Sequence, residues 1–129
     1  LQAYESARML LEAEVGQWPD DPRFHSSLGI AYAALGRKVD AIREGKNAVE
    51  LLPIAKDAFY GIPYVEDLAF IYALTGETEA AVEQLENLLS IPSWFSVPWL
   101  RMDPQWDPIR NHPGFLQLLE KHSGRKGKE

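Results

Sequence analysis

The sequence has no cysteine, which excludes disulfide bonds and thiolate metal sites. It has three histidines among its 129 residues, and none is paired at i, i+4 with a second ligand as in a helical zinc site. A glycine-rich phosphate loop and a nucleophile-elbow motif are missing as well. We therefore expect no catalytic residue, no metal and no cofactor, and we interpret the chain as non-enzymatic.

Long hydrophobic runs are also missing. No apolar stretch approaches the roughly 20 residues needed to span a bilayer, and no signal peptide is visible. We expect a cytoplasmic location and no membrane contact by this segment. The first residue is Leu1 rather than a methionine, and residues 1–18 already have the pattern of a helix. The chain is therefore predicted to be a segment of a longer protein.

Positive charge is scarce outside the C-terminus. The net charge is −6, and the last nine residues hold four basic residues and one acidic residue. These give +3, so the rest of the chain carries −9. An acidic body lacks the basic face that a phosphate backbone requires, so we expect no nucleic acid to bind this segment. For residues 123–129 we favour a disordered, solvated basic tail over a contact with nucleic acid or lipid.

Hydrophobic residues are plentiful, at 46%, and the length suits one core better than two domains. Small and aromatic residues recur at the spacing of a 34-residue unit of two antiparallel helices. The signature positions of this unit are His25, Leu28, Gly29, Tyr32, Gly36, Ala41, Ala48 and Pro53.

The ends of the two helices are marked by residues of known local preference. Asp21 is a good N-cap and Pro22 suits the first helical position. Gly36 suits the left-handed conformation that ends a helix. We predict helices over about 22–35 and over 38–51 or 38–52.

Small residues indicate where these helices cross. Gly29 and Ala41 are expected at the crossing, where a larger side chain would separate the helices. Gly45 occupies a position that is usually aromatic in this repeat, and glycine in a helix costs about 1 kcal/mol relative to alanine. Either a neighbouring side chain fills that space or the helix is locally weak. We interpret His25 as a packed helical residue rather than a ligand or a base.

The same pattern recurs in the second half of the chain. It is carried by Leu68, Ala69, Tyr72, Gly76, Ala81, Leu85 and Leu88. Leu28 and Leu68 are 40 residues apart, six more than one repeat, so residues between the units form an insertion. We expect the next helix to begin near Lys56 and to bend around 61–63.

Over about residues 1–91 the chain resembles the tetratricopeptide repeat family. The resemblance implies an all-α fold, a right-handed helical solenoid of antiparallel helix pairs. We predict a single domain over 1–122. It consists of a half repeat at 1–21, a repeat at 22–55, a repeat with an insertion at 56–92 and a C-terminal cap at 93–122.

The cap contains several proline-linked signals. Asp103 and Asp107 each precede a proline, so we favour two helix caps over a pair of catalytic or cation-binding carboxylates. His112 is expected to cap or turn the chain before a final helix at 113–122. The inward residues of that helix are predicted to be Phe115, Leu116, Leu118 and Leu119. For the aromatic residues of this region we favour core packing over a binding patch: Trp94, Phe95, Trp99, Trp106 and Phe115.

The segments 85–93, 100–110 and 113–115 resemble the C-terminal end of bacterial multidomain regulators. In those proteins a repeat array follows a serine/threonine kinase, a nucleotide cyclase or a winged-helix domain. The resemblance implies a bacterial origin and a C-terminal position. Gly114 stands where that pattern usually has arginine, which puts any contact of that arginine in doubt.

The family resemblance also implies where a partner binds, because the first helix of each unit lines the concave face. Groove-facing positions are Arg23, Ser26, Ser27, Ile30 and Ala33 in the first unit and Glu66, Asp67, Phe70 and Ala73 in the second. The carboxylate clamp of chaperone-binding members needs several basic and amide side chains, and only Arg23 qualifies here. The groove suits an apolar or weakly basic segment. For Glu66 and Asp67 a solvated face is the alternative.

These observations favour a protein–protein interaction module within a larger bacterial signalling or regulatory protein. The partner is expected to be a protein or peptide. One alternative is a homodimer formed through the exposed face of the N-terminal helix. Another is a substrate-recruiting arm of a larger enzyme.

Overall fold

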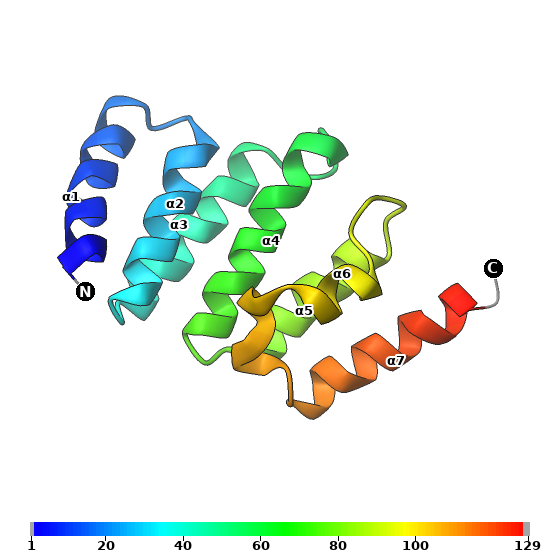
Figure 1. Ribbon diagram of the computed structural model, residues 1–129. Helices are drawn as coiled ribbons and strands as arrows, with labels where there is room; N and C mark the ends of the chain where they lie inside the picture. The colour runs from blue at the N-terminus through cyan, green and yellow to red at the C-terminus, as the bar shows by residue number, and fades with distance from the viewer. Residues whose placement is uncertain (1, 128–129) are drawn as a thin grey trace.

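The computed structural model describes residues 2–127, with side chains through residue 123. Over this range the chain is helical and contains no strand, which confirms the all-α prediction (Figure 1). The elements are α1 (Gln2–Gln17), α2 (Pro22–Ala34), α3 (Lys38–Leu51), α4 (Ala58–Leu74), α5 (Thr78–Leu89), α6 (Val97–Met102), the 3-10 helix η1 (Pro104–Ile109) and α7 (Pro113–Gly127).

The first helix pair, α2 and α3, begins and ends where the sequence signals lie. The Asp21 carboxylate accepts a hydrogen bond from the Arg23 backbone N–H at 3.0 Å, and Pro22 occupies the first turn. Gly36 follows α2 with φ +80°, a conformation that glycine adopts without steric cost. The backbone N–H of Arg37 then bonds to the carbonyl of Tyr32 at 2.9 Å. The predicted bounds of both helices are confirmed to within one residue.

The second pair, α4 and α5, has the same turn. Gly76 has φ +84°, and the backbone N–H of Glu77 bonds to the carbonyl of Tyr72 at 2.9 Å. Helix α4 begins at Ala58, two residues later than predicted, because the Asp57 carboxylate caps it by accepting from the Tyr60 N–H at 3.1 Å. The helix is continuous through 61–63 and contains Pro63, and the predicted bend there stays a prediction.

The two pairs therefore repeat at an offset of 40 residues. Equivalent positions are buried in both: Leu28 and Leu68, Gly29 and Ala69, Tyr32 and Tyr72, Ala41 and Ala81, Gly45 and Leu85, and Ala48 and Leu88. Helix α2 packs against both α3 and α4, so the pairs share one contact surface.

The close approach of these helices explains the two buried glycines of the first pair. A Cβ on Gly29 would lie 2.8 Å from Ile71 Cδ1 and 3.0 Å from the Ala41 carbonyl oxygen. A Cβ on Gly45 would lie 2.9 Å from Ile71 Cδ1 and 3.0 Å from Leu68 Cδ1. Side chains of α4 thus fill the space beside Gly45, which decides between the two explanations that the sequence left open.

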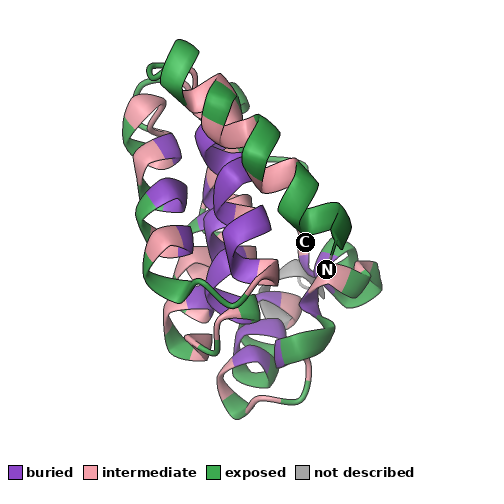
Figure 2. Cartoon of the chain, turned by 90° about the vertical axis from the view of Figure 1, so that its left-hand side faces the viewer, coloured by how far each residue is buried: buried purple, intermediate pink, exposed green. Residues whose placement is uncertain are grey.

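The core has two parts. The smaller one lies among α2, α3 and α4 and includes Leu28 and Tyr32 of α2 and Ile71 of α4. The larger one joins α4 and α5 to the C-terminal segment, where Trp106 and Phe115 are fully buried. Helix α1 contributes no buried residue, and Figure 2, which faces it, shows its ribbon without the buried colour.

In the C-terminal segment, some of the predicted helix-capping residues are confirmed and one is not. Asp103 caps η1 by accepting from the Gln105 N–H at 3.1 Å, as predicted. Asp107 lies inside η1 and pairs with Arg110 at 2.9 Å, so the prediction of a second helix cap there was wrong. His112 Nδ1 accepts from the Gly114 backbone N–H at 3.0 Å and so caps α7.

Helix α7 continues to Gly127, beyond the predicted end at His122 and through most of the predicted tail. Residues 128 and 129 of that tail lie outside the described range. Phe115, Leu118 and Leu119 are buried as predicted, whereas Leu116 is half exposed.

Candidate functional site

The residues predicted to line a groove lie on α2 and α4, which contact each other. On α2, Arg23 and Ser27 are exposed, Ile30 is half-buried, and Ser26 and Ala33 are buried. On α4, the side chains of Glu66, Asp67 and Phe70 are half-buried and Ala73 is buried. The structure therefore brings the two predicted sets onto adjacent helices.

A hydrogen bond joins the two helices at the centre of this face. The Ser26 hydroxyl donates to Asp67 Oδ2 at 2.7 Å. Burial raises the pKa of the Asp67 carboxyl, and the bond from Ser26 partly opposes the rise. Asp67 is thus held in place on a largely desolvated part of the face.

Glu66 lies beside it and is perturbed more strongly. Burial, and then the charge of Asp67, raise the pKa of Glu66 to about 7. Its Oε2 accepts a hydrogen bond from Gln105 Nε2 at 2.8 Å, and Trp99 also hydrogen-bonds to it. A carboxyl with such a pKa in a half-buried position marks a candidate functional site.

The C-terminal segment forms one wall of this face. Gln105 Nε2 bonds to Asp103 Oδ2 at 2.8 Å as well as to Glu66. The rings of Phe70 and Trp106 pack edge to face, with centroids 6.3 Å apart. Figure 1 shows η1 lying across α4. The α4 half of the predicted groove is therefore bordered by the cap rather than open along its length.

Sequence reasoning missed Asp103, Gln105 and Trp99 as neighbours of Glu66. They lie more than 30 positions away along the chain, and no spacing rule of the repeat connects them to α4. Only the folding of the cap onto α4 places them there. Of the aromatic residues assigned to the core, Phe95, Trp106 and Phe115 are buried, whereas Trp94 and Trp99 are each 47% exposed.

Glu66 and Asp67 are half-buried and lack the cationic partners that the half-buried carboxylates Glu12 and Asp40 have. Among the described residues, no lysine, arginine or histidine forms an ion pair with either of them. An unpaired carboxylate on a partly desolvated face is a favourable place for a cation supplied from outside.

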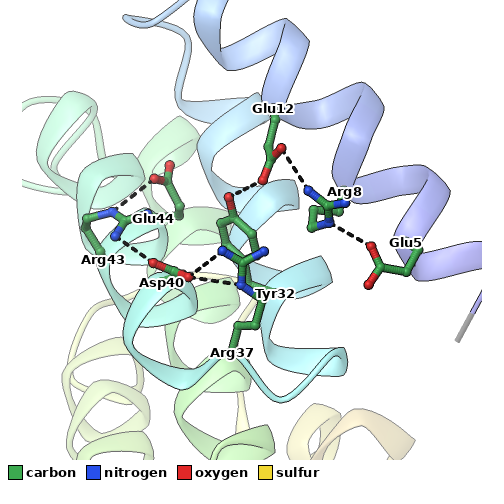
Figure 3. Close-up of polar contacts among 8 residues, drawn as sticks. All are labelled: Glu5, Arg8, Glu12, Tyr32, Arg37, Asp40, Arg43 and Glu44. Carbon is green, nitrogen blue, oxygen red and sulfur yellow. Dashed lines mark hydrogen bonds and ion pairs between the residues drawn. The ribbon is translucent and has the colours of Figure 1, made fainter.

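A second polar cluster shows the contrasting case (Figure 3). The Tyr32 hydroxyl donates to Glu12 Oε2 at 2.6 Å, and Arg8 donates to Glu12 Oε1 at 2.9 Å. Burial, and then the bond to Glu12, raise the pKa of Tyr32 to about 12. The guanidinium of Arg37 lies 4.5 Å from the centroid of the Tyr32 ring. The bond between Tyr32 and Glu12 joins α2 to α1.

The cluster continues along α3. Asp40 pairs with Arg37 and with Arg43, each at 2.8 Å, and these hydrogen bonds lower the pKa of Asp40. Arg43 Nε also contacts Glu44 at 3.3 Å. Every carboxylate named in this cluster has a cationic or hydroxyl partner, which indicates a structural role.

His25 is part of the same buried framework. Its Nδ1 lies 2.6 Å from Glu44 Oε1, and its Nε2 lies 2.7 Å from the Pro19 carbonyl oxygen. His25 and Glu44 are each 7% exposed. The imidazole therefore joins α2, α3 and the loop before α2, in agreement with its interpretation as a packed helical residue.

No group of three or more histidine and carboxylate side chains in the described part of the chain is arranged to hold a metal ion. None of the helices within residues 2–127 combines the length and apolar character needed to cross a membrane. Comparison of the chain with models of known families, with curated proteins and with solved structures finds no match.

Proposed function

We propose that this chain is a non-catalytic protein–protein interaction module within a larger bacterial signalling or regulatory protein. It binds a segment of a partner protein on the face formed by α2 and α4. The observation that carries the proposal is the adjacent pair Glu66 and Asp67. Both are partly desolvated, both have raised pKa values, and neither has a cationic partner among the described residues.

The chemistry of the face defines the partner segment. Glu66 and Asp67 favour a lysine or arginine, because a charge-assisted hydrogen bond compensates a desolvated carboxylate. Half-buried Ile30 and Phe70 favour apolar residues next to that basic residue. The segment is therefore weakly basic and partly apolar, and we infer a cytoplasmic setting for the interaction.

The finer fold assignment is part of this proposal. We infer that α2–α3 and α4–α5 are tetratricopeptide-like units of a right-handed solenoid, with α1 as a half unit and 93–122 as a cap. The equivalent glycine turns at Gly36 and Gly76 support this assignment, as do the equivalent buried alanines Ala41 and Ala81. Terminal repeats need a cover for their apolar face, which is the role of the cap here.

The test begins with selection of peptides from a random display library on the purified chain. Selected peptides are expected to be enriched in a lysine or arginine flanked by apolar residues. Their affinity is then measured by calorimetry for the chain and for the Glu66→Gln/Asp67→Asn variant. We expect at least about a tenfold loss, because two charge-assisted contacts are weakened.

The matched control is Glu79→Gln/Glu83→Gln, which removes the same charge from exposed positions of α5. The control is expected to bind as the wild type does. Selection of peptides without basic residues contradicts the proposal. So does an unchanged affinity in the Glu66/Asp67 variant whose circular dichroism shows an intact fold.

Self-association is a second candidate function, favoured by the outer face of α1. Glu5 is the only charged residue among the exposed residues of this helix, and Met9 and Leu10 are 63% and 70% exposed. A face with so little charge can pack on its own copy about a two-fold axis with little like-charge repulsion. Sedimentation from 1 to about 200 μM tests this: dimerisation abolished by Leu10→Glu supports it, and a monomer throughout rules it out.

A further inference from the structure

The loop between α1 and α2 and the side chain of Tyr64 on α4 enclose an open cleft of about 670 Å³. Its lining residues include two aromatic residues, Trp18 and Tyr64, and three charged residues, Asp20, Asp21 and Arg23. Trp18 is 53% exposed and Tyr64 is half-buried. The volume is within the range of pockets that hold small ligands or single side chains.

The loop that forms the cleft is held in one conformation by hydrogen bonds. The backbone N–H of Trp18 bonds to the Glu14 carbonyl at 2.7 Å, and the N–H of Asp21 bonds to the Trp18 carbonyl at 3.1 Å. A His25 ring nitrogen also lies 2.7 Å from the Pro19 carbonyl oxygen. The loop that lines the cleft is thus already ordered, which reduces the conformational entropy lost when a ligand binds.

The charges at the cleft leave one carboxylate uncompensated. Asp21 caps α2 and also binds the Arg23 guanidinium through two oxygens, at 3.0 and 2.7 Å. These bonds neutralise Arg23 and offset the positive partial charge at the start of α2. Asp20 is exposed and forms no ion pair among the described residues. The cleft therefore combines exposed aromatic surface with a net negative charge.

We propose that this cleft binds the cationic end of a lysine or arginine side chain, with the cation against the Trp18 and Tyr64 rings and Asp20 as its counter-ion. Aromatic rings attract cations through their negative faces, and a nearby carboxylate adds Coulombic attraction. The inference rests on the proposed function for the source of the cation, a second basic residue in the segment bound at Glu66 and Asp67.

The cleft is tested without a partner, using N-acetyl-arginine amide and N-acetyl-lysine amide as probes. The neutral control is N-acetyl-citrulline amide, which has nearly the shape of the arginine probe but no charge. The readout is the Trp18 indole N–H resonance in a ¹⁵N-labelled chain, assigned by its loss in Trp18→Phe. We expect a saturable shift with millimolar affinity for one or both cationic probes and at least about threefold weaker binding of citrulline.

Asp20→Asn is the decisive variant, because Asp20 is exposed and takes no part in the loop's hydrogen bonds. It is expected to weaken binding of the cationic probe about three- to tenfold, while the exposed control Glu79→Gln leaves it unchanged. The inference is overturned by an unmoved Trp18 resonance, by citrulline binding as well as arginine does, or by an Asp20→Asn variant that binds as the wild type does. The arginine and lysine arms show which cation the cleft prefers.

The same titration in Glu66→Gln/Asp67→Asn separates this inference from the proposed function. The Trp18 shift is expected to persist in that variant. If the probes bind the cleft but selected peptides ignore Glu66 and Asp67, the proposed function fails and the cleft stands. If peptides require Glu66 and Asp67 but the probes leave Trp18 unmoved, the cleft inference alone fails.

Discussion

The two helix pairs share a backbone plan but fill it with side chains of different size. Both turns use a glycine with positive φ, and Ala41 and Ala81 are fully buried at equivalent places. Further along the second helices, Gly45 corresponds to the large residue Leu85. Beside Gly45, Leu68 and Ile71 of α4 already occupy the space. Beside Leu85, the core includes side chains of the cap. The size of the residue at this position thus depends on which side chains pack against it.

The pairs also differ in their buried polar groups. His25 and Glu44 form a buried hydrogen-bonded pair in the first unit. The residues 40 positions later are Val65 and Gln84, and Val65 belongs to the apolar core. The other ring nitrogen of His25 lies 2.7 Å from the Pro19 carbonyl oxygen, in the loop before the first unit. The comparison indicates that His25 holds the loop before α2 in place through this contact. Val65, at the equivalent position of the second unit, has no polar side chain that could do the same.

The largest effect is expected in the core that the second pair shares with the cap. Leu85→Ala removes a fully buried side chain and leaves a cavity, so we expect a loss of about 4 kcal/mol in the free energy of unfolding. Urea denaturation followed by circular dichroism measures it. Leu116→Ala, which truncates a half-exposed side chain of α7, is the control and should lower the free energy of unfolding by less than about 1 kcal/mol. Equal losses would show that the buried Leu85 side chain contributes no more to stability than the half-exposed Leu116.

The next largest effect is expected when His25 and Glu44 of the first unit are replaced by the residues at the equivalent positions of the second unit. His25→Val leaves the Glu44 carboxylate buried without its imidazole partner, which is expected to cost about 3 kcal/mol. The double variant His25→Val/Glu44→Gln reproduces Val65 and Gln84 and should recover more than half of that loss. Denaturation midpoints of the two variants decide the matter. A double variant no more stable than the single one would show that the carboxylate is not the source of the cost.

A smaller effect probes the helix crossing of the first pair. Gly29→Ala gives the residue found at Ala69 in the second pair, and its Cβ meets the Ala41 carbonyl at 3.0 Å. We expect a net loss of about 2 kcal/mol in unfolding free energy despite the better helix propensity of alanine. Gly16→Ala, where a Cβ meets nothing within 4 Å, should stabilise α1 by a few tenths of a kcal/mol. Thermal melts of the two variants should shift in opposite directions.

The smallest effect concerns Glu66, which corresponds to Ser26 in the first pair. The pKa of Glu66 is about 7 in the fold against 4.5 for a free side chain, so the native state binds its proton more tightly. Ionisation therefore destabilises the fold as pH rises from about 4.5 to about 7, and the full cost is present above that range. Glu66→Gln should be more stable than the wild type at pH 8.5, on the order of 1 kcal/mol after solvent screening.

At pH 4 most of this difference should be lost, because Glu66 is then mostly protonated in both the folded and unfolded states. Urea midpoints across this pH range give the measurement, and Glu79→Gln on the exposed face of α5 controls for the change of net charge. A difference between Glu66→Gln and wild type that does not vary with pH would contradict the assignment.

Local signals predicted much of the fold. Asp21, Pro22 and Gly36 act through caps and backbone conformations that depend on adjacent residues, so the bounds of α2 and α3 were predicted closely. Asp107 was misread because an Asp-Pro pair also occurs inside a 3-10 helix, where the carboxylate pairs with Arg110 instead. The candidate site was predicted only in part. The family resemblance implied Ser26, Glu66 and Asp67, but nothing in the sequence pointed to Gln105.

The sequence by itself determined the all-α class, the two helix pairs and the positions of their turns, because periodicity, capping and glycine conformations are local properties. The tertiary structure decided which side chains fill the space beside Gly45, which carboxylates find cations, and where the cap rests. Those features depend on contacts between residues far apart in the sequence, as in the bond between Ser26 and Asp67, and chain spacing alone does not contain them.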